Sequence, residues 1–238
     1  MSTGDRLGVR EDLVDANRIL VRHGILDAFG HVSVRDPDDP SRFLISRNLA
    51  PGLVTPDDIQ VIGLDGTTAD DRPSYLERFI HGEIYRARAD VQAVVHSHSA
   101  SMVPFSISRT PLQAVWHMAG FLGEAVPVFE IRDSVGSSSD LLIRSGSLGA
   151  DLAATLGGAA VALMRGHGFV AVGDSIPQAV ARAVYADLNA RAQVTAGQLG
   201  GYTALTAEEG AAAAESNNGQ LTRAWEIWRA NARRGESV

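Results

Sequence analysis

The chain of 238 residues contains no cysteine. This absence excludes disulfide bonds, iron–sulfur clusters, thiolate zinc sites and cysteine nucleophiles. Any metal bound by this chain must therefore use nitrogen and oxygen ligands. The redox compartment is left undetermined by the same absence.

Long apolar runs and an excess of positive charge are also missing. No apolar stretch reaches roughly 18 residues, the length that spans a bilayer, and no signal-like basic-then-apolar segment opens the chain. The net charge is −7 and the pI is about 5.4. Phosphates would be repelled by such a surface. We expect a cytoplasmic protein whose partner is a small molecule, with no nucleic acid and no membrane.

The composition predicts one large folded domain over residues 1–238. Hydrophobic residues make up 45% of the chain, enough for a well-buried core. Within this domain, residues 207–238 are expected to form a C-terminal docking tail. Trp225 and Trp228 lie there on a predicted helix, and because large aromatic side chains are costly to leave in water, we expect them to pack on the body or on another subunit.

Local patterns predict a mixture of helices and strands. Helical spacing predicts helices over residues 5–22, 140–156 and 175–199. Apolar or alternating segments predict strands over residues 30–35, 42–46, 57–66, 91–98, 126–131, 161–164 and 169–173. Ser74 followed by Glu77 has the spacing of a capping box, which predicts a helix running through Tyr85. A cap of this kind would give Glu77 a purely structural role.

The strand before residue 99 ends in His96-Ser97-His98, whose alternation places both imidazoles on one face. Such a pair forms two prongs of a metal site and needs further ligands from distant segments. His167 lies between two glycines, where a sharp turn lets its ring reach inward. Glu77 supplies an acid upstream. Three imidazoles and a carboxylate are typical of catalytic metal sites.

The other histidines have different interpretations. His23 is expected to act as a cation at a helix C-terminus, and His81 as a partly buried surface group. His31 follows Gly30 at the start of a predicted strand, where polar groups often reach ligands. A functional role and a structural one are equally favoured for it.

Several of these motifs occur in the order found in one known family. Glu77, Arg88-Ala89-Asp90-Val91, His96-Ser97-His98, Gly30-His31-Val32-Ser33-Val34-Arg35 and Gly166-His167-Gly168 together resemble the class II aldolase/adducin family, over roughly residues 12–199. The resemblance implies an α/β fold with three layers, α/β/α, and a mainly antiparallel central sheet. It also implies one divalent metal ion held by His96, His98 and His167, with Glu77 as a fourth ligand or an acid/base. A homotetramer with active sites between adjacent subunits is implied as well.

The chain departs from the sugar-phosphate members at three phosphate-binding elements. Gly30-His31-Val32-Ser33 replaces Gly-Asn-Val-Ser, Ser46-Arg47-Asn48-Leu49 replaces a Thr-Gly loop, and Tyr75-Leu76 replaces a Ser-Ser pair before the glutamate. A tyrosine that donates a proton from the neighbouring subunit corresponds to His117. The segment around Glu77 and the Ser46-Arg47 loop resemble the branch that contains decarboxylases of hydroxylated aromatic or pyridine carboxylates.

The resulting hypothesis is a metal-dependent carbon–carbon lyase that decarboxylates a small hydroxylated aromatic or heteroaromatic carboxylate. In this hypothesis Ser46 and Arg47 belong to the substrate-binding loop, and Arg47 grips a second carboxylate of the substrate. His31 binds the chelating end, and Glu77 or His117 delivers a proton to carbon. Zinc suits the imidazoles, and the added carboxylate also admits manganese.

Two alternatives remain open. The same metal site could serve a class II aldolase that cleaves a non-phosphorylated keto or hydroxy acid, because both reactions stabilise a developing anion. A non-catalytic adducin-like scaffold is the other alternative. It is disfavoured because adducin-type relatives have lost the metal ligands that this chain retains at His96, His98 and His167.

Overall fold

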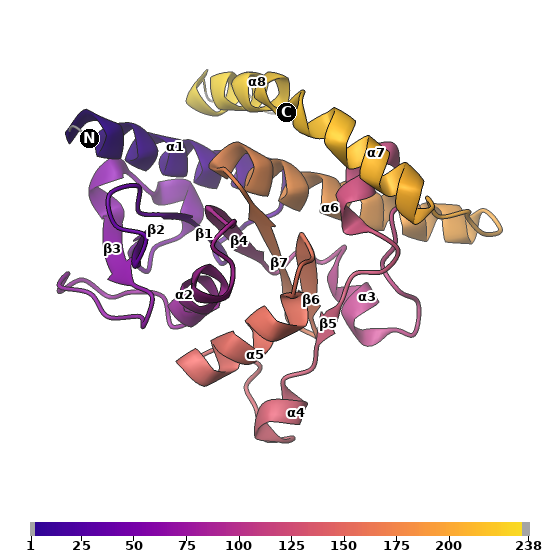
Figure 1. Cartoon of the computed structure of the whole chain (residues 1–238), viewed down its shortest axis with the longest axis horizontal. Helices are drawn as coiled ribbons and strands as arrows, with labels where there is room; N and C mark the ends of the chain where they lie inside the picture. Colours follow the sequence, from indigo (N-terminus) through magenta and orange to yellow (C-terminus); the bar gives the residue numbers. More distant parts are fainter. Residues whose placement is uncertain (1–2, 235–238) are drawn as a thin grey trace.

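The computed structural model describes residues 3–234 and is built on one seven-stranded sheet (Figure 1). The strand order is β3-β2-β1-β4-β7-β6-β5, and every pairing is antiparallel except that of β5 with β6. The strands are β1 (His31–Arg35), β2 (Arg42–Ser46), β3 (Ile59–Gly63), β4 (Ala93–Ser97), β5 (Val128–Phe129), β6 (Val161–Met164) and β7 (Gly168–Gly173). The predicted mainly antiparallel sheet is confirmed.

Helices cover both faces of this sheet, which gives three layers. In Figure 1, α1 (Thr3–Arg22), α6 (Ile176–Gln198) and α8 (Leu221–Arg234) lie on one side, with α2 (Arg78–Ala87) and α5 (Gly146–Leu156) on the other. Each side has its own hydrophobic core. The other helical segments are η1 (Pro51–Leu53), η2 (Pro56–Asp58), α3 (Val103–Ile107), η3 (His117–Leu122), α4 (Arg132–Val135) and α7 (Ala207–Asn218).

Alternation along the central strands separates the two cores. Val32 and Val34 of β1 and Val95 of β4 pack with α1 and α6, whereas Val94 packs on the side of α2 and α5. Residues two apart on a strand share a face. His96 therefore lies on the α2 side of β4. The polar functional residues of both central strands thus face one helical layer.

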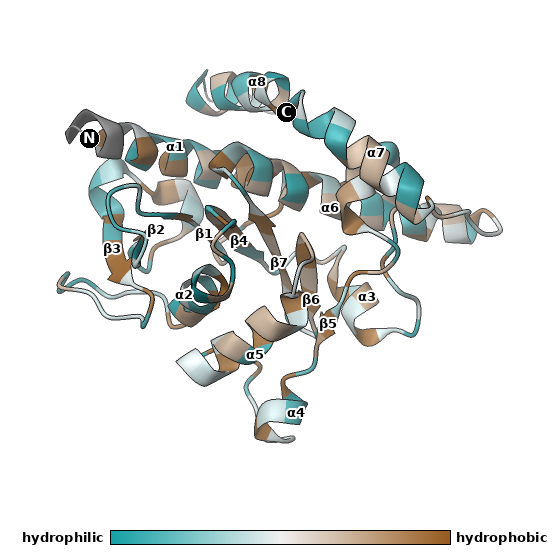
Figure 2. Cartoon of the chain, in the orientation of Figure 1, coloured by the Kyte–Doolittle hydropathy of each residue, from teal (hydrophilic) through white to brown (hydrophobic). Residues whose placement is uncertain are grey.

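The C-terminal helices pack on the body of the same chain. Trp225 and Trp228 of α8 are buried among residues of α1 and α6. Arg229 and Arg233 donate to the buried Asp15 of α1, with shortest N–O distances of 2.8 and 2.7 Å. In the hydropathy view, α1, α6 and α8 each carry both hydrophobic and hydrophilic residues (Figure 2). Apolar burial and ion pairs thus hold α8 on the body of the chain.

Several predicted boundaries shift. The helix expected over residues 140–156 begins only at Gly146, because Ser145 accepts a hydrogen bond from the amide of Leu148 and caps it. The strand expected over residues 126–131 pairs for two residues. Residues 56–58 form η2 rather than the start of β3. Helix α6 begins after Ser175 as predicted, but Leu188 on it is partly exposed rather than part of the buried stripe.

None of the helices described within residues 3–234 combines the length and the apolar character that crossing a bilayer requires.

Candidate active site

Two side chains of the candidate site come from the end of β4. Nε2 of His96 lies 3.1 Å from Nε2 of His98. The serines that alternate with them hold this segment in place: Ser97 Oγ donates to the carbonyl of Ile25 at 2.5 Å, and Ser99 Oγ donates to the buried carboxylate of Asp187. The alternation predicted from sequence is confirmed. Imidazoles point to one side and hydroxyl groups tie the backbone down on the other.

His167 arrives from the turn between β6 and β7. Gly166 has a φ of +64°, a conformation that side chains with a Cβ rarely adopt. A Cβ on Gly168 would lie 2.0 Å from the carbonyl oxygen of Ser97. Both glycines are therefore needed for the turn to approach β4. Nε2 of His167 lies 3.0 Å from Nε2 of His98 as a result.

Glu77 occupies the N-terminus of α2, and the predicted capping box is wrong. Its carboxylate makes no helix-capping hydrogen bond, and Ser74 Oγ donates instead to Gln60. Oε1 of Glu77 accepts from the amide of Ile143 at 3.0 Å. Oε2 lies 3.5 Å from Nε2 of both His96 and His167. The carboxylate thus faces the histidines rather than its own helix.

Burial alone would raise the pKa of the Glu77 carboxyl, but hydrogen bonds and positive charge from His167 and His96 outweigh burial and hold its pKa well below the usual range. Burial, assisted by the neighbouring imidazoles, lowers the pKa of His98 to about 4. The cluster therefore combines an ionised carboxylate with a neutral His98 ring. Both are the protonation states that metal ligands require.

The donor set fits a divalent metal ion. One potential ligand atom from each of Glu77, His96, His98 and His167 lies within 4.8 Å of all the others. Metal–nitrogen bonds of about 2.0–2.1 Å around a common ion would put ligand atoms roughly 3–3.5 Å apart, as the nearest pairs here are. Nδ1 of His96 also contacts the carbonyl of Phe169 at 3.1 Å. This bond assigns the proton to Nδ1 and leaves Nε2 free to ligate.

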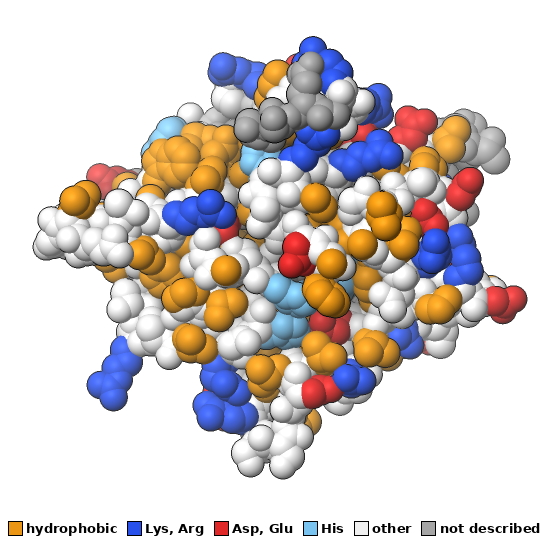
Figure 3. Space-filling view, turned by 180° about the vertical axis from the view of Figure 1, so that it is seen from behind, with side chains coloured by type: hydrophobic (Ala, Val, Ile, Leu, Met, Phe, Trp, Pro, Cys, Tyr) orange, Lys and Arg blue, Asp and Glu red, His pale blue; other side chains and the backbone are white. Residues whose placement is uncertain are grey.

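A cavity of about 680 Å³ opens beside the cluster. Most of its lining is apolar, and His31, Tyr75, Glu77 and His98 contribute the ionisable groups. The complete lining is Ala28, Phe29, Gly30, His31, Asn48, Leu49, Ala50, Tyr75, Leu76, Glu77, His98 and Leu142. Histidine side chains are visible among hydrophobic ones near the middle of one face (Figure 3). A small organic molecule with an apolar body and a chelating end suits this shape and chemistry.

His31 lies in the wall of this cavity, as its predicted role requires. Its ring is 4.5 Å from the ring of Tyr75 and 5.1 Å from that of His96, centroid to centroid. Tyr75 donates to the carbonyl of Leu49 at 2.5 Å and contacts Ser46 Oγ at 3.1 Å. Ser46 is buried and does not line the cavity. Its hydroxyl helps to position Tyr75.

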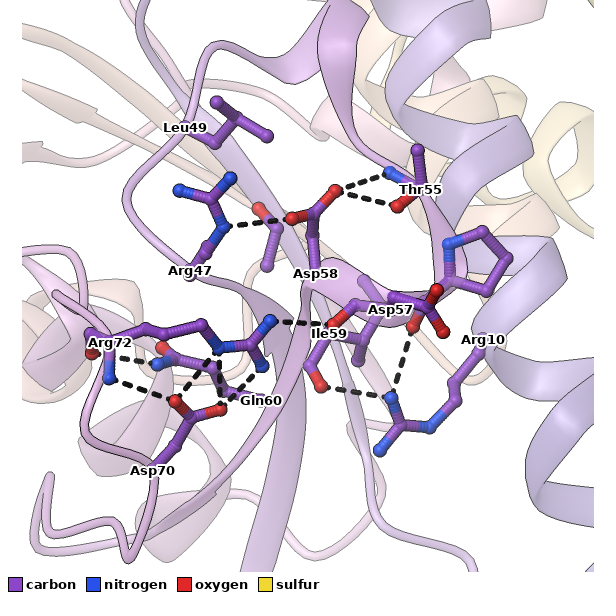
Figure 4. A network of polar contacts seen from close by, with 12 residues as sticks. Arg10, Arg47, Leu49, Thr55, Asp57, Asp58, Ile59, Gln60, Asp70 and Arg72 are labelled. Carbon is purple, nitrogen blue, oxygen red and sulfur yellow. Dashed lines mark hydrogen bonds and ion pairs between the residues drawn. The ribbon is translucent and has the colours of Figure 1, made fainter.

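Arg47 and His117 lie outside the cavity lining of their own chain. Nε of Arg47 donates to Oδ1 of Asp58 at 2.8 Å, and Asp58 also accepts from the amide and hydroxyl of Thr55 (Figure 4). His117 is exposed on η3. Its carbonyl accepts from the side chain of Asn217. Direct contact of either residue with substrate stays a prediction.

The interpretation of two other histidines was wrong. His81 is fully buried: its Nε2 lies 2.6 Å from Nδ1 of His31 and its Nδ1 lies 2.6 Å from Oγ of Ser33. His23 packs edge-on against Trp228, and burial lowers its pKa, which disfavours a cation there. The sequence shows only that His81 lies one helical turn after Glu77; its burial depends on β1, whose His31 and Ser33 contact it.

Comparison with known proteins bears on this geometry. Residues 11–194 match the Class II Aldolase and Adducin N-terminal domain. The chain belongs to the class II aldolase/adducin family. The curated relatives include Decarboxylase tropJ of Talaromyces stipitatus, 38% identical over 88% of each chain. They also include a 3,4-dihydroxyphthalate decarboxylase of Arthrobacter keyseri, 29% identical over 82% of this chain and 81% of the relative.

Solved structures of the same family share the fold. An aldolase II superfamily protein from Pseudomonas syringae has a TM-score of 0.81 at 23% identity, over 100% of this chain and 96% of the other. An L-fuculose 1-phosphate aldolase from Glaciozyma antarctica has a TM-score of 0.78 at 24% identity, over 98% and 92%. The predicted family and three-layer fold are thereby confirmed.

Proposed function

We propose that this class II aldolase/adducin family member is a metal-dependent lyase that decarboxylates a small hydroxylated aromatic or heteroaromatic carboxylate. The observation that carries the proposal is the cluster of Glu77, His96, His98 and His167 beside a mainly apolar cavity. The named decarboxylases among its relatives support the same reaction class. Aldolases also occur among the relatives, but at lower identity than Decarboxylase tropJ, so the aldolase and scaffold alternatives are not favoured.

His96, His98 and His167 would hold the ion, and the second oxygen of Glu77 is placed either to complete the ligand set or to move a proton. Zinc and manganese both suit this donor set. A bound divalent ion supplies a Lewis acid for the electron density left when carbon dioxide departs. The amide of Ile143 holds Oε1 of Glu77, so that Oε2 remains the oxygen available to the reaction.

The cavity accounts for the rest of the substrate. Phe29, Leu49, Leu76 and Leu142 present an apolar wall to the body of the substrate and exclude water from it. His31 lines the cavity and would hydrogen-bond an oxygen at the chelating end. Loss of carbon dioxide leaves an electron pair on the ring carbon, and one proton must be delivered there. Glu77 and His117 are the proposed donors.

We further propose a homotetramer whose active sites lie between subunits, so that His117 of one chain serves the cavity of the next. Two facts support this assignment: His117 is exposed, and it does not line its own cavity. Arg47 would bind a second carboxylate through the guanidinium nitrogens that Asp58 leaves unused.

The test is an assay of purified protein loaded with Mn²⁺ or Zn²⁺, using 3,4-dihydroxyphthalate and related hydroxybenzoates as probes. Carbon dioxide release that depends on metal, and that His98→Ala eliminates, is expected. Metal-dependent release of an aldehyde from hydroxy acids, without carbon dioxide from any aromatic carboxylate, would favour the aldolase instead. Metal content that stays far below one ion per chain after reconstitution would refute the proposed site.

The subunit arrangement has its own test. His98→Ala and His117→Ala lack different parts of the site, so each homotetramer is expected to be inactive. Subunits exchanged between the two variants should recover part of the activity, because some interfaces then combine an intact metal cluster with an intact His117. Light scattering gives the assembly size. Failure of the mixture to recover activity, while each variant assembles normally, would place His117 outside the site.

A further inference from the structure

Polar side chains form two matching rows between β1 and α2. His31, Ser33 and Arg35 alternate on β1, with valines facing the opposite core between them. His81 and Tyr85 lie one turn apart on α2. Residues two apart on a strand are roughly 6.6 Å apart along its axis, and residues four apart on a helix roughly 6 Å. The two rows therefore stay in step.

These rows form one continuous chain of hydrogen bonds from the core to the cavity. Tyr85 Oη lies 2.7 Å from Ser33 Oγ, Ser33 Oγ 2.6 Å from His81 Nδ1, and His81 Nε2 2.6 Å from His31 Nδ1. All four side chains are almost fully buried. Within residues 3–234, His31 Nε2 has no hydrogen-bond partner, which leaves it as the nitrogen that a bound molecule meets.

The far end of the chain fixes its direction. Burial raises the pKa of the Tyr85 hydroxyl, so the phenol is protonated. Within residues 3–234, Ser33 Oγ is the one hydrogen-bond partner of Tyr85 Oη, and a phenol that accepted from Ser33 would leave its own buried proton without an acceptor. Tyr85 therefore donates its proton to Ser33. Arg35 secures this end: its guanidinium lies 4.9 Å from the Tyr85 ring centroid and donates to the Tyr85 carbonyl at 2.8 Å.

The remaining protons follow by hydrogen-bond bookkeeping. Ser33 accepts from Tyr85 and donates to Nδ1 of His81, so the His81 proton is on Nε2 and is donated to Nδ1 of His31. In the reverse direction Tyr85 would accept from Ser33, and its own hydroxyl proton would have no acceptor among residues 3–234. Only one direction satisfies every group in this buried network, and an unsatisfied member would be costly.

We propose that Tyr85, Ser33 and His81 are positioning residues that hold His31 in the tautomer with its proton on Nε2, as a donor aimed into the cavity. This inference rests on the proposed function for its substrate: the donor meets an anionic oxygen of the hydroxylated carboxylate. An acceptor nitrogen at the same place would repel that oxygen. The polar row thus adds selectivity for an anionic oxygen beside the metal.

The decisive measurement is the tautomer of His31 itself, in zinc-loaded protein labelled with ¹⁵N-histidine. Long-range ¹H–¹⁵N correlation spectra distinguish the protonated from the unprotonated nitrogen of each ring, and His31→Gln assigns the signal. We expect the proton on Nε2 in the unmodified protein. A proton on Nδ1 would overturn the proposal without any variant or substrate.

Two variants test the hydrogen-bonded chain from Tyr85 through Ser33 and His81 to His31, which we call the relay. Tyr85→Phe removes one oxygen and leaves the Ser33 hydroxyl free to turn, so the His31 proton is expected to divide between both nitrogens. Ser33→Ala cuts the chain nearer the cavity and should do the same. Tyr75→Phe is the matched control: it removes a phenol hydroxyl beside His31 that belongs to no relay bond. An unchanged His31 spectrum in both relay variants would contradict the proposal.

Kinetics distinguish this proposal from the proposed function. Ser33→Ala should lower kcat/KM roughly 10- to 100-fold for a substrate that the enzyme decarboxylates, because loss of a residue that orients a site residue typically has an effect of this size. The variant should retain its full metal content. If no aromatic carboxylate is decarboxylated while the His31 proton is on Nε2 and moves in the variants, the function fails and the relay stands. If Ser33→Ala has an altered His31 spectrum but an unchanged kcat/KM, the relay does not contribute to catalysis.

Discussion

Two cavities of similar volume differ in how their polar groups are used. The one beside the histidine cluster measures about 680 Å³, and the other, along the edge strand β3, about 620 Å³. The second is lined by arginines and aspartates. Arg72 grips Asp70 with two nitrogens, at 2.5 to 3.2 Å, and donates to the carbonyl of Asp57 at 2.7 Å (Figure 4). Arg10 donates to the carbonyls of Pro56 and Ile59.

The two cavities differ in how their polar groups are paired, not in whether polar groups line them. At the β3 edge, Arg10, Arg72 and Asp70 are matched with protein partners, which fixes the loops around η2. Beside the histidine cavity, one potential ligand atom from each of Glu77, His96, His98 and His167 converges on one place, all within 4.8 Å of one another. Three imidazoles and a carboxylate arranged in this way fit a divalent cation. The arginines and aspartates of the other cavity are paired with protein groups and do not converge in this way.

The largest effect that would separate the two cavities is loss of a ligand. His98→Ala should eliminate stoichiometric metal and lower activity by more than about 100-fold, since even residues behind the ligands cost 10- to 100-fold. Arg72→Gln breaks the Arg72–Asp70 ion pair of the other cavity and should leave metal content and kcat/KM unchanged. Metal analysis and a carbon dioxide assay measure both. Equal losses of metal and activity in the two variants would contradict the functional difference between the two cavities.

Glu77→Gln sharpens the role of the acid within the cluster. Gln keeps an oxygen that accepts from Ile143 but cannot carry the negative charge or a transferable proton. Much of the metal should be retained, whereas kcat should fall roughly 10²- to 10⁴-fold if the carboxylate moves a proton. Metal content and kcat are measured on the same preparation. Full turnover of a verified substrate would assign Glu77 to structure alone.

Substitution of Arg47 tests whether its guanidinium serves the histidine cavity or only the network at the β3 edge. Its Nε is paired with Asp58 in the β3-edge network, yet the neighbouring Asn48 and Leu49 line the histidine cavity. Arg47→Gln should raise KM for a dicarboxylate roughly 10-fold, by loss of a charge-assisted contact, with little change in kcat. Asp58→Asn is the control, because it weakens the pair but keeps the guanidinium. Equal KM values in both variants would assign Arg47 to the loop.

Much of this arrangement was predictable from local pattern. The strand ending at His96 and His98, and the glycine turn at His167, follow from alternation and from backbone freedom. Helix α6 follows from its cap at Ser175. These features depend on neighbours in sequence, and the metal ligands came with the family resemblance. Their mutual distances required the fold.

Features that depend on long-range contacts were not predictable. Glu77 has the spacing of a helix cap, but its carboxylate accepts a hydrogen bond from the amide of Ile143, 66 positions away. The helical pattern predicts a surface position for His81, but in the fold His31 and Ser33 of β1 pack against it. Pairing between a strand and a helix has no local signature. Such pairing decides which histidines are buried.

The smallest expected effect concerns pH, and it follows from that burial. Burial lowers the pKa of His81 to about 3, with His96 acting in the same direction and Glu77 opposing it. The unfolded value is about 6.5. Because the unfolded chain takes up the proton first, the stability contributed by neutral His81 is complete above about pH 6.5 and is lost as pH falls from there towards 3.

His81→Gln removes this titration and keeps a polar side chain. Between about pH 7.5 and 5.5, metal-free wild-type protein should lose about 1 kcal/mol more unfolding free energy than the variant does. Urea midpoints at both pH values measure the difference. Metal-free samples exclude proton-driven loss of the ion. Ion pairs at the β3 edge contribute nothing over this range, because hydrogen bonds from Arg72 hold the pKa of Asp70 far below it. If the unfolding free energy has the same pH dependence in both proteins, the acid sensitivity arises from groups other than His81.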